Sequence, residues 1–313
     1  MAGPRGPAIS VSRAPPWTRE RACPLDTREM GQSLKRLVVT ADDFGLSHEV
    51  NEAVEQAHRN GILTAASLMV SAPGAADAVA RARRTPSLRI GLHLVLVEAW
   101  PTLPPAELSD LTDAQGLMRR DMERLGLDLA LKASARRQLA AEIRAQFAAF
   151  RATGLPLDHV NAHKHFHIHP LIAGMVLRIG RDYGMRALRV PREPRDLLAR
   201  AEPGFQAKPA LDTAPWAALL AVRARQAGLL IPTRTLGLAW SGAMTPERVT
   251  ALLRHLPDGL TELYTHPATA GGFPGEAPGY QYAAERDALI APQAREAAER
   301  GGAVRGGFSD FLP

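Results

Sequence analysis

The chain has 313 residues, of which 46% are hydrophobic, and it carries one cysteine and a formal net charge of +6. This length allows one large domain or two small ones, each with a buried core. A single cysteine excludes an intramolecular disulfide and a thiolate metal cluster, and no apolar run reaches the roughly 18 residues that span a bilayer.

Residues 1–34 are rich in Pro, Gly, Arg and Ser and lack periodicity, so we expect a disordered tail. Residues 1–36 hold seven Lys or Arg and three acids, which accounts for +4 of the net charge of +6. The remaining chain is nearly neutral and lacks clustered basic residues, so we do not expect nucleic-acid binding. The N-terminus has no apolar signal core, which favours a cytoplasmic location, and Met30 is an alternative start.

From Leu34 onward, short apolar runs alternate with segments of helical spacing. Strands are predicted at 36–41, 64–71, 88–96, 156–162, 187–190, 234–240, 261–266 and 303–308. Helices are predicted at 48–60, 73–84, 132–153, 170–183 and 215–232, while residues 98–130 read as an irregular insertion. Some seven such units in one chain favour a parallel α/β barrel over an open sheet, with a single domain over residues 35–313.

Carboxylates and imidazoles gather at the ends of at least four predicted strands, where a (β/α) barrel places its chemistry. They are Asp42 and Asp43, then His93, then His163 with His165, His167 and His169 behind it, and His266. Two imidazoles and a carboxylate from different strands form a ligand set for a divalent cation with an open position. A second carboxylate could take a proton from water, and His266 could give one to a leaving group.

Each of these residues also has a structural interpretation. Asp42 and Asp43 could cap the following helix, and His93 could be a hydrogen-bonded core residue. The histidines of "NAHKHFHIHP" could form a solvated loop. Their joint position at strand ends favours a site over these separate explanations.

Five segments together resemble the YdjC-like carbohydrate deacetylases: "TADDFGLS", "NGILTAASLMV", "GLHLVL", "DHVNAHKHFHIHP" and "ELYTHPA". The match runs from about residue 35 to the C-terminus, and "GLAWSGAM" and "GGFPGEAPGY" are similar to the branch associated with hopanoid biosynthesis, HpnK. The resemblance implies a deformed (β/α) barrel related to the NodB-type polysaccharide deacetylases. It also implies hydrolytic removal of an N-acetyl group from an amino sugar.

The resemblance also implies roles for particular residues. Asp43, His93 and His163 would hold the metal, Asp42 would be the base and His266 the acid; the order within the aspartate pair could be reversed. We expect His165, His167, Trp240 and Tyr280 to face the substrate. Lys164 departs from the many relatives that have His at this position, which leaves His163 as the expected ligand.

The implied cofactor is one divalent cation, either Mg²⁺ or Zn²⁺. For the HpnK branch the substrate would be an N-acetylglucosaminyl hopanoid, which would bring peripheral contact with the inner face of the membrane. A homodimer is compatible with the sequence. The alternatives are deacetylation of chitin-type oligosaccharides, a metal-dependent phosphoesterase on a similar barrel, and a sugar- or lipid-binding barrel with a structural metal.

Overall fold

The computed structural model describes residues 35–206 and 213–313, so the predicted tail at residues 1–34 lies outside the described part. Seven strands form one parallel sheet in the order β4-β3-β2-β1-β6-β5, and β7 pairs with the start of β1. Their bounds are β1 Lys35–Phe44, β2 Ala65–Leu68, β3 Arg89–Leu94, β4 Val160–Ala162, β5 Arg234–Leu236, β6 Gly259–Thr265 and β7 Val304–Arg305.

The sheet curls into an incomplete barrel, and residues 186–192 lie between its two ends. Leu188 bridges to Val160 in parallel, and Ala187 bridges to Leu230 just before β5. Thr235 then donates its backbone N–H to Arg192 O at 2.8 Å. The segment predicted as the strand at 187–190 therefore closes the gap through a few bonds, which confirms the deformed (β/α) barrel.

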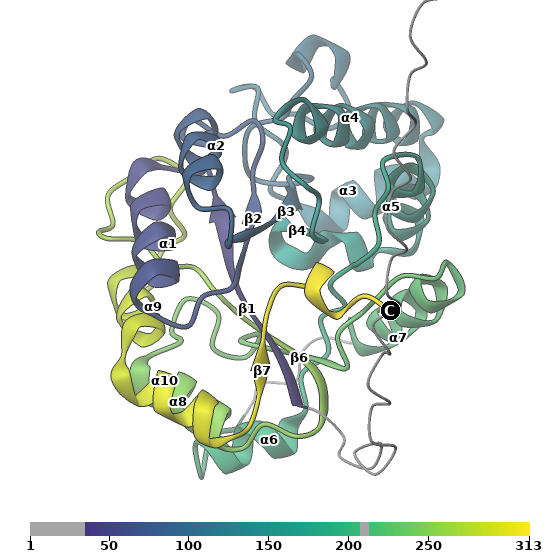
Figure 1. The fold of residues 1–313 in the computed structure, drawn as a ribbon. Coiled ribbons are helices and arrows are strands. Elements are labelled where there is room, and N and C mark those ends of the chain that lie inside the picture. Colours follow the sequence, from purple (N-terminus) through teal and green to yellow (C-terminus); the bar gives the residue numbers. More distant parts are fainter. Residues whose placement is uncertain (1–34, 207–212) are drawn as a thin grey trace, which may run out of the picture. The chain divides into compact units, whose positions relative to one another are not determined.

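Helices separate most of the strands and surround the sheet (Figure 1). They are α1 His48–Asn60, α2 Ala75–Arg84, α3 Met122–Leu131, α4 Ala133–Ala152, α5 Pro170–Asp182, α6 Arg195–Ala201, α7 Thr213–Gln226, α8 Pro246–Arg254, α9 Tyr282–Ile290 and α10 Pro292–Arg300, with short 3₁₀ turns η2 Pro105–Glu107, η3 His163–Ile168 and η4 Ser309–Phe311. None of the helices in the described ranges is both long and apolar enough to span a membrane.

The sequence predicts an irregular insertion over residues 98–130. This prediction is wrong for its last part, which forms α3. Asp121 caps that helix by accepting a hydrogen bond from Arg124 N at 2.8 Å. Buried Leu125 and Leu129 belong to the main hydrophobic core. The Pro-rich start and Gly126 obscure this helix in the sequence, although its cap and its apolar spacing are both present.

Strand periodicity determines which residues enter the barrel, since every second side chain points the same way. On β1, the residues whose side chains enter the barrel are Val38, Thr40 and Asp42. Val38 packs in a small apolar cluster with Phe308 at one end of the barrel. Thr40 donates to Glu262 Oε1 at 2.9 Å, and Asp42 lines the cleft at the other end. The interior therefore changes from apolar to ionic along the barrel axis.

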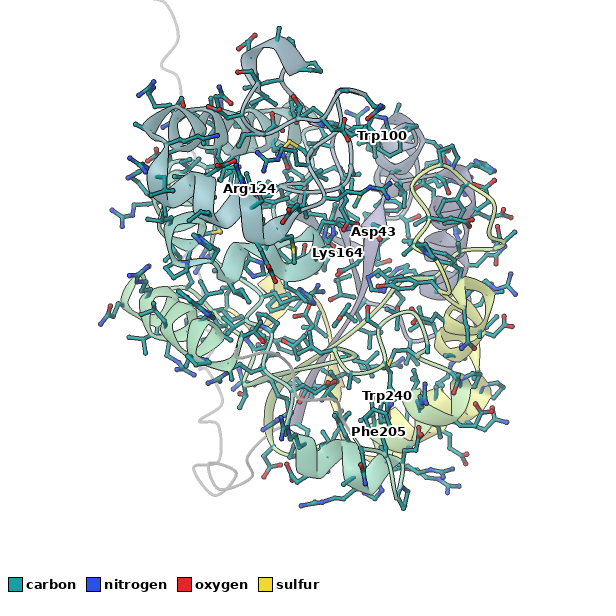
Figure 2. The ribbon with its side chains drawn as sticks, turned by 180° about the vertical axis from the view of Figure 1, so that it is seen from behind. Asp43, Trp100, Arg124, Lys164, Phe205 and Trp240 are labelled. Carbon is teal, nitrogen blue, oxygen red and sulfur yellow. The ribbon has the colours of Figure 1, made fainter. Side chains whose placement is uncertain are left out.

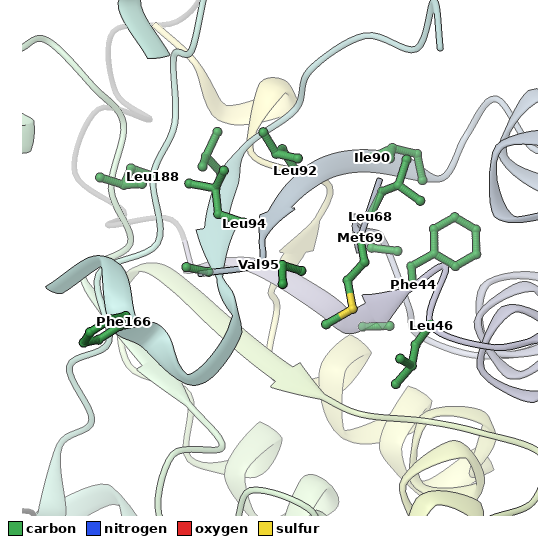
Figure 3. Close-up of a cluster of buried hydrophobic side chains, with 14 of the residues drawn as sticks. Phe44, Leu46, Leu68, Met69, Ile90, Leu92, Leu94, Val95, Phe166 and Leu188 are labelled. Atoms are coloured by element: carbon green, nitrogen blue, oxygen red, sulfur yellow. The ribbon is translucent and has the colours of Figure 1, made fainter. Parts of the chain in front are cut away.

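The main hydrophobic core fills the space between the sheet and the helices. Figure 3 shows part of it, with Phe44, Leu68, Ile90 and Leu92 from three neighbouring strands. Gly91, between the last two, lacks a side chain where the His159 ring lies, and a Cβ there would come within 2.5 Å of that ring. This core holds the ends of β1 to β4 in place, and those ends carry the predicted reactive groups.

Candidate metal centre and active site

Asp43, His93 and His163 converge at the carboxyl ends of β1, β3 and β4, as the sequence predicts. Each offers one ligand atom, and these atoms lie within 4.8 Å of one another. Asp43 Oδ1 is 3.2 Å from His93 Nε2 and 3.0 Å from His163 Nδ1. Burial opposes ionisation of Asp43, but the two imidazoles outweigh it and hold the pKa of Asp43 well below its usual value. This is a compact set of three donors with mixed oxygen and nitrogen chemistry.

Neighbouring side chains orient His93 for such a role. Asn161 Nδ2 donates to Asp42 Oδ1 at 3.0 Å, which turns Asn161 Oδ1 toward His93 Nδ1 at 2.7 Å. Because an amide oxygen only accepts, Nδ1 carries the proton and the lone pair of His93 is on Nε2. His93 Nε2 is buried, and with its lone pair toward Asp43 Oδ1 at 3.2 Å it makes no hydrogen bond among the described residues. The donor set thus fits a divalent cation with an open position.

The backbone around this set adopts conformations that non-glycine residues rarely take. Asp43, Glu98, Lys164 and His165 have φ between 54° and 66° and are the non-glycine residues with positive φ in the described ranges. All four line one cleft. Left-handed backbone costs such residues about 1 kcal/mol or more each, and such conformations tend to occur at functional sites. The turn at Lys164 and His165 also ends the period-two alternation, so η3 is not a strand.

Asp42 is held differently from Asp43. Arg189 donates to both of its oxygens, Nη1 to Oδ2 at 2.5 Å and Nη2 to Oδ1 at 2.9 Å. Ser67 Oγ also donates to Asp42 Oδ1 at 2.9 Å. Burial opposes ionisation of Asp42, but Arg189 and nearby His93 outweigh it, so its pKa lies well below the usual range. Asp42 is therefore an anion fixed in orientation beside the donor set, and Asp43 is the carboxylate that contacts both imidazoles.

Arg189 is the main residue of the site that sequence reasoning missed. It is fully buried, also donates to Glu262 Oε1 at 2.8 Å, and lies over the Tyr264 ring at 4.5 Å. In the sequence it is one arginine among several in "ALRVPREPR". The available signals were a cation inside the predicted strand at 187–190 and an acid, Glu262, inside the strand at 261–266. Two opposite charges within buried strands predict a buried ion pair.

His266 follows β6 and lines the cleft. Its backbone N–H donates to Glu285 Oε2, and its Nδ1 lies 3.8 Å from the same oxygen. Glu285 is fully buried on α9 and also accepts from Met244 N at 2.9 Å. The rings of Tyr264 and Tyr280 contact His266 edge to face, at 5.5 and 5.0 Å between centroids. The imidazole is thus held in one place by aromatic packing and a buried carboxylate.

These residues line a cleft of about 280 Å³. Among the predicted site residues, Asp42, Asp43, His93, His163, His165, His266 and Tyr280 all border it. His165 Nε2 is 3.1 Å from Tyr264 Oη, and Tyr280 Oη is 2.9 Å from Ser241 Oγ. Leu46, Met69, Leu238 and Pro278 also line the cleft. The cleft therefore combines converging polar groups with apolar surface.

Two predicted substrate contacts do not border the cleft. His167 is fully buried, and its Nε2 bonds to Arg189 O at 2.9 Å; burial lowers the pKa of His167 to about 4. Trp240 packs on Phe205 and under the Arg248 guanidinium, and Figure 2 shows it far from Asp43. The turn at Lys164 and His165 directs His167 into the core, and Trp240 is buried. Neither side chain therefore borders the cleft.

Lys164 and Glu98, two of the residues with positive φ, form an ion pair at the rim of the cleft. Lys164 Nζ is 3.4 Å from Glu98 Oε2, and each side chain is about one-third exposed, at 34% and 32%. Glu98 belongs to the insertion and is anchored by a backbone bond to Met118 O at 3.0 Å. The pair joins the insertion to the turn that begins at His163.

Comparisons with known proteins agree with this arrangement. A carbohydrate deacetylase of Brevibacillus brevis is 38% identical over 148 residues, which are 47% of this chain and 56% of that protein. Another from Thermoanaerobacter pseudethanolicus is 24% identical over 235 residues, 75% of this chain and 82% of that protein. A crystal structure from Enterococcus faecalis V583, of a protein named for cellobiose-phosphate cleavage, superposes with a TM-score of 0.70 at 23% identity, covering 90% of this chain and all of that one.

The Enterococcus structure supports the fold alone, because its sequence identity is low. The chain spans little more than half the length of the Brevibacillus relative, so that likeness does not extend to the whole of that protein. The sequence pattern of the YdjC-like proteins matches residues 36–300, a range within which the donor set, Asp42, Arg189 and His266 all lie. On this evidence the chain belongs to the YdjC-like protein family.

Proposed function

We propose that this protein is a metal-dependent hydrolase that removes the N-acetyl group of an amino sugar. The observation that carries the proposal is the convergence of Asp43, His93 and His163, with the lone pair of His93 Nε2 facing Asp43, inside a cleft that also holds Asp42 and His266. The named activity of the relatives supports the same reaction class.

The residues divide the work as follows. Asp43, His93 and His163 would hold a divalent cation, which when bound supplies a Lewis acid and makes water more acidic. Asp42, fixed by Arg189, accepts the proton of the attacking water, although the same arginine lowers its basicity. His266, placed by Glu285 and Tyr280, gives a proton to the departing amine nitrogen. Base and acid thus approach from different strands.

The cleft volume constrains the substrate. About 280 Å³ lies just below the usual range of small-molecule pockets, about 300–1,000 Å³, which suits one sugar ring and not a polycyclic lipid as well. For an N-acetylglucosaminyl hopanoid, which we favour from the resemblance of the sequence to the HpnK branch, the lipid would remain outside the cleft. The apolar side chains of Leu46, Met69 and Leu238 in the cleft would meet the sugar or the first part of the lipid.

The alternatives receive less support from the site. A phosphoesterase with several metals needs more carboxylates, but Asp43 is the one carboxylate in the donor group found among the described residues, and Arg189 binds both Asp42 and Glu262. A closed structural site would need a fourth protein ligand such as His167, and that imidazole is bound to Arg189 O. Chitin-type oligosaccharides remain a second candidate substrate, because the cleft would accept their terminal sugar.

The proposal is tested by incubating the metal-loaded protein with N-acetylglucosaminyl hopanoid and, separately, with a chitin oligosaccharide. Mass spectrometry should find the loss of one acetyl group from one of them, and a parallel assay with a phosphate monoester should find no release of phosphate. No deacetylation of either compound by metal-loaded protein, or phosphate release alone, would overturn the proposal.

Variants assign the roles separately. Asp43→Ala, His93→Ala and His163→Ala should each lose bound metal, measured by elemental mass spectrometry, together with activity. Asp42→Asn should keep metal and lose turnover by about 10²–10⁴-fold. His255→Ala, at an exposed histidine beyond α8, is the matched control and should keep both. Near-normal turnover of Asp42→Asn with bound metal would show that another group is the base.

A further inference from the structure

Large exposed hydrophobic side chains gather on three neighbouring helices. Of the eight in the described residues, three lie on α3, one on α5 and three on α7, and only Val304 lies elsewhere. The seven are Met122, Leu127, Leu131, Leu171, Trp216, Leu219 and Val222. Such side chains scattered singly need no explanation, but gathered on adjacent elements they mark an interaction surface.

Helix α7 is apolar on both of its faces. Ala217, Leu220, Ala221 and Ala224 are buried against the core. Trp216, Leu219 and Val222, three residues apart from one another, are 45%, 38% and 49% exposed. A surface helix ordinarily turns charged residues outward, yet Thr213–Gln226 contains no acid and only two arginines, both in its last turn. We call Trp216, Leu219 and Val222 the α7 face.

The α7 face is held rigidly and lies close to the cleft. The Trp216 ring stacks on His169, with 6.2 Å between centroids and 8° between planes. The other side of His169 meets α3, where a Cβ on Gly126 would be 3.4 Å from His169 Nε2. Arg223 donates to Pro170 O at 3.1 Å. His169 directly follows η3, whose Lys164 and His165 line the cleft, so one short turn joins the α7 face to the site.

The segments that contain α5 and α7 are rich in arginine and poor in acids. Residues 170–186 and 213–226, which include α5 and α7, contain five arginines and one acid, Asp182. The arginines are Arg178, Arg181, Arg186, Arg223 and Arg225, all at least partly exposed. On α3, the exposed Arg124 lies 3.8 Å from Asp128 Oδ1, and the start of that helix carries Asp121 and Glu123, so the excess of cations lies on α5 and α7. An apolar face on an arginine-rich pair of helices is complementary to an anionic lipid surface.

We propose that the α7 face docks this protein onto an anionic phospholipid bilayer. Trp216, Leu219 and Val222 would enter the interfacial region, and the arginines of α5 and α7 would contact lipid phosphates. This inference rests on the proposed function in one respect: a membrane would present a lipid-linked amino sugar at the turn that leads into the cleft. A second copy of the chain fits less well, since a two-fold interface would bring this arginine-rich surface against itself.

The test uses the full chain in cosedimentation with large unilamellar vesicles, either of phosphatidylcholine alone or of phosphatidylcholine mixed with phosphatidylglycerol. The unchanged protein should bind the anionic vesicles. The triple variant Trp216→Ser, Leu219→Ser, Val222→Ser should bind them at least tenfold more weakly, and so should Arg178→Glu combined with Arg225→Glu. Val304→Ser, exposed to the same 49% as Val222, is the matched control and should bind like the unchanged protein.

Thermal unfolding of each variant serves as the control that the variant is folded. The basic N-terminal residues are present in every variant, so a difference between variants reports the α7 face. Equal vesicle binding by the triple variant and the unchanged protein would overturn the proposal. So would a dimer in solution that becomes a monomer in the triple variant without any vesicle binding. Vesicle binding needs no catalysis, so failure of deacetylation would overturn the proposed function and leave this result intact.

Discussion

Replacing Arg189 with Met should destabilise the protein strongly. Arg189 is fully buried and is bonded to Asp42 at 2.5 and 2.9 Å and to Glu262 at 2.8 Å. Removing one partner of a buried ion pair costs about 3–5 kcal/mol, because the remaining charge is left without compensation. Here two carboxylates lose their partner. At roughly 2–4 °C per kcal/mol for a domain of this size, Tm should fall by roughly 6–20 °C.

The assay is thermal unfolding followed by circular dichroism. Arg200→Met is the matched control, because Arg200 and Asp196 are 3.2 Å apart with side chains 63% and 68% exposed. An exposed pair contributes at most about 1 kcal/mol, so its loss should lower Tm by less than about 4 °C.

A second variant separates lost charge compensation from lost packing. Arg189→Met combined with Glu262→Leu removes one uncompensated carboxylate and should recover part of the loss. If Arg189→Met lowered Tm no more than Arg200→Met, the ionic layer inside the barrel would not stabilise the fold. If the double variant were less stable than Arg189→Met, uncompensated charge would not be the cause.

Three further predictions concern groups around the site and the other end of the barrel. Asn161→Ala removes the bond that orients His93, so metal affinity should fall about 10–100-fold in a metal titration, and unchanged affinity would contradict that role. Asp158 accepts from Phe308 N at 3.1 Å and Ser309 N at 2.8 Å, and burial opposes ionisation, but His159 and these bonds lower its pKa. Asp158→Asn should therefore cost about 1–3 kcal/mol at pH 7. Since the folded pKa is lowered, this difference in Tm should persist down to about pH 3.9 and shrink as pH falls further; a difference that grew in acid would refute the assignment. Gly91→Ala should cost about 1–3 kcal/mol through contact with the His159 ring, whereas Gly174→Ala on α5, with open space around its Cβ, should leave Tm equal or higher; equal effects of the two would refute the packing argument.

The sequence predicts the donor set well because strand periodicity and strand ends are local properties. Asp43, His93 and His163 each follow or end a recognisable apolar run, so their meeting follows from parallel strands alone. Arg189 could not be placed in this way, because its strand is reduced to isolated bridges and its partners are 147 and 73 residues away in the chain. Burial of an arginine depends on those distant carboxylates and not on its neighbours.

The histidine-rich stretch illustrates the opposite case. Its spacing of two suggests that four imidazoles share one side, but the left-handed turn at Lys164 and His165 sends them in different directions. His163 joins the donor set, His165 contacts Tyr264, His167 is buried, and His169 stacks on Trp216. Tertiary contacts decide that turn, and no residue in the stretch is a glycine that would predict it.

The left-handed residues of the cleft also have a consequence for how this protein could evolve. Asp43, Glu98, Lys164 and His165 hold conformations that the isolated chain would avoid, so neighbouring contacts must maintain them. Glycine at 164 or 165 would tolerate the same φ and relieve that local cost, yet it would loosen the turn that carries His163. Selection for heat resistance and selection for turnover would therefore favour different residues at these positions, and a more stable descendant could be a slower catalyst.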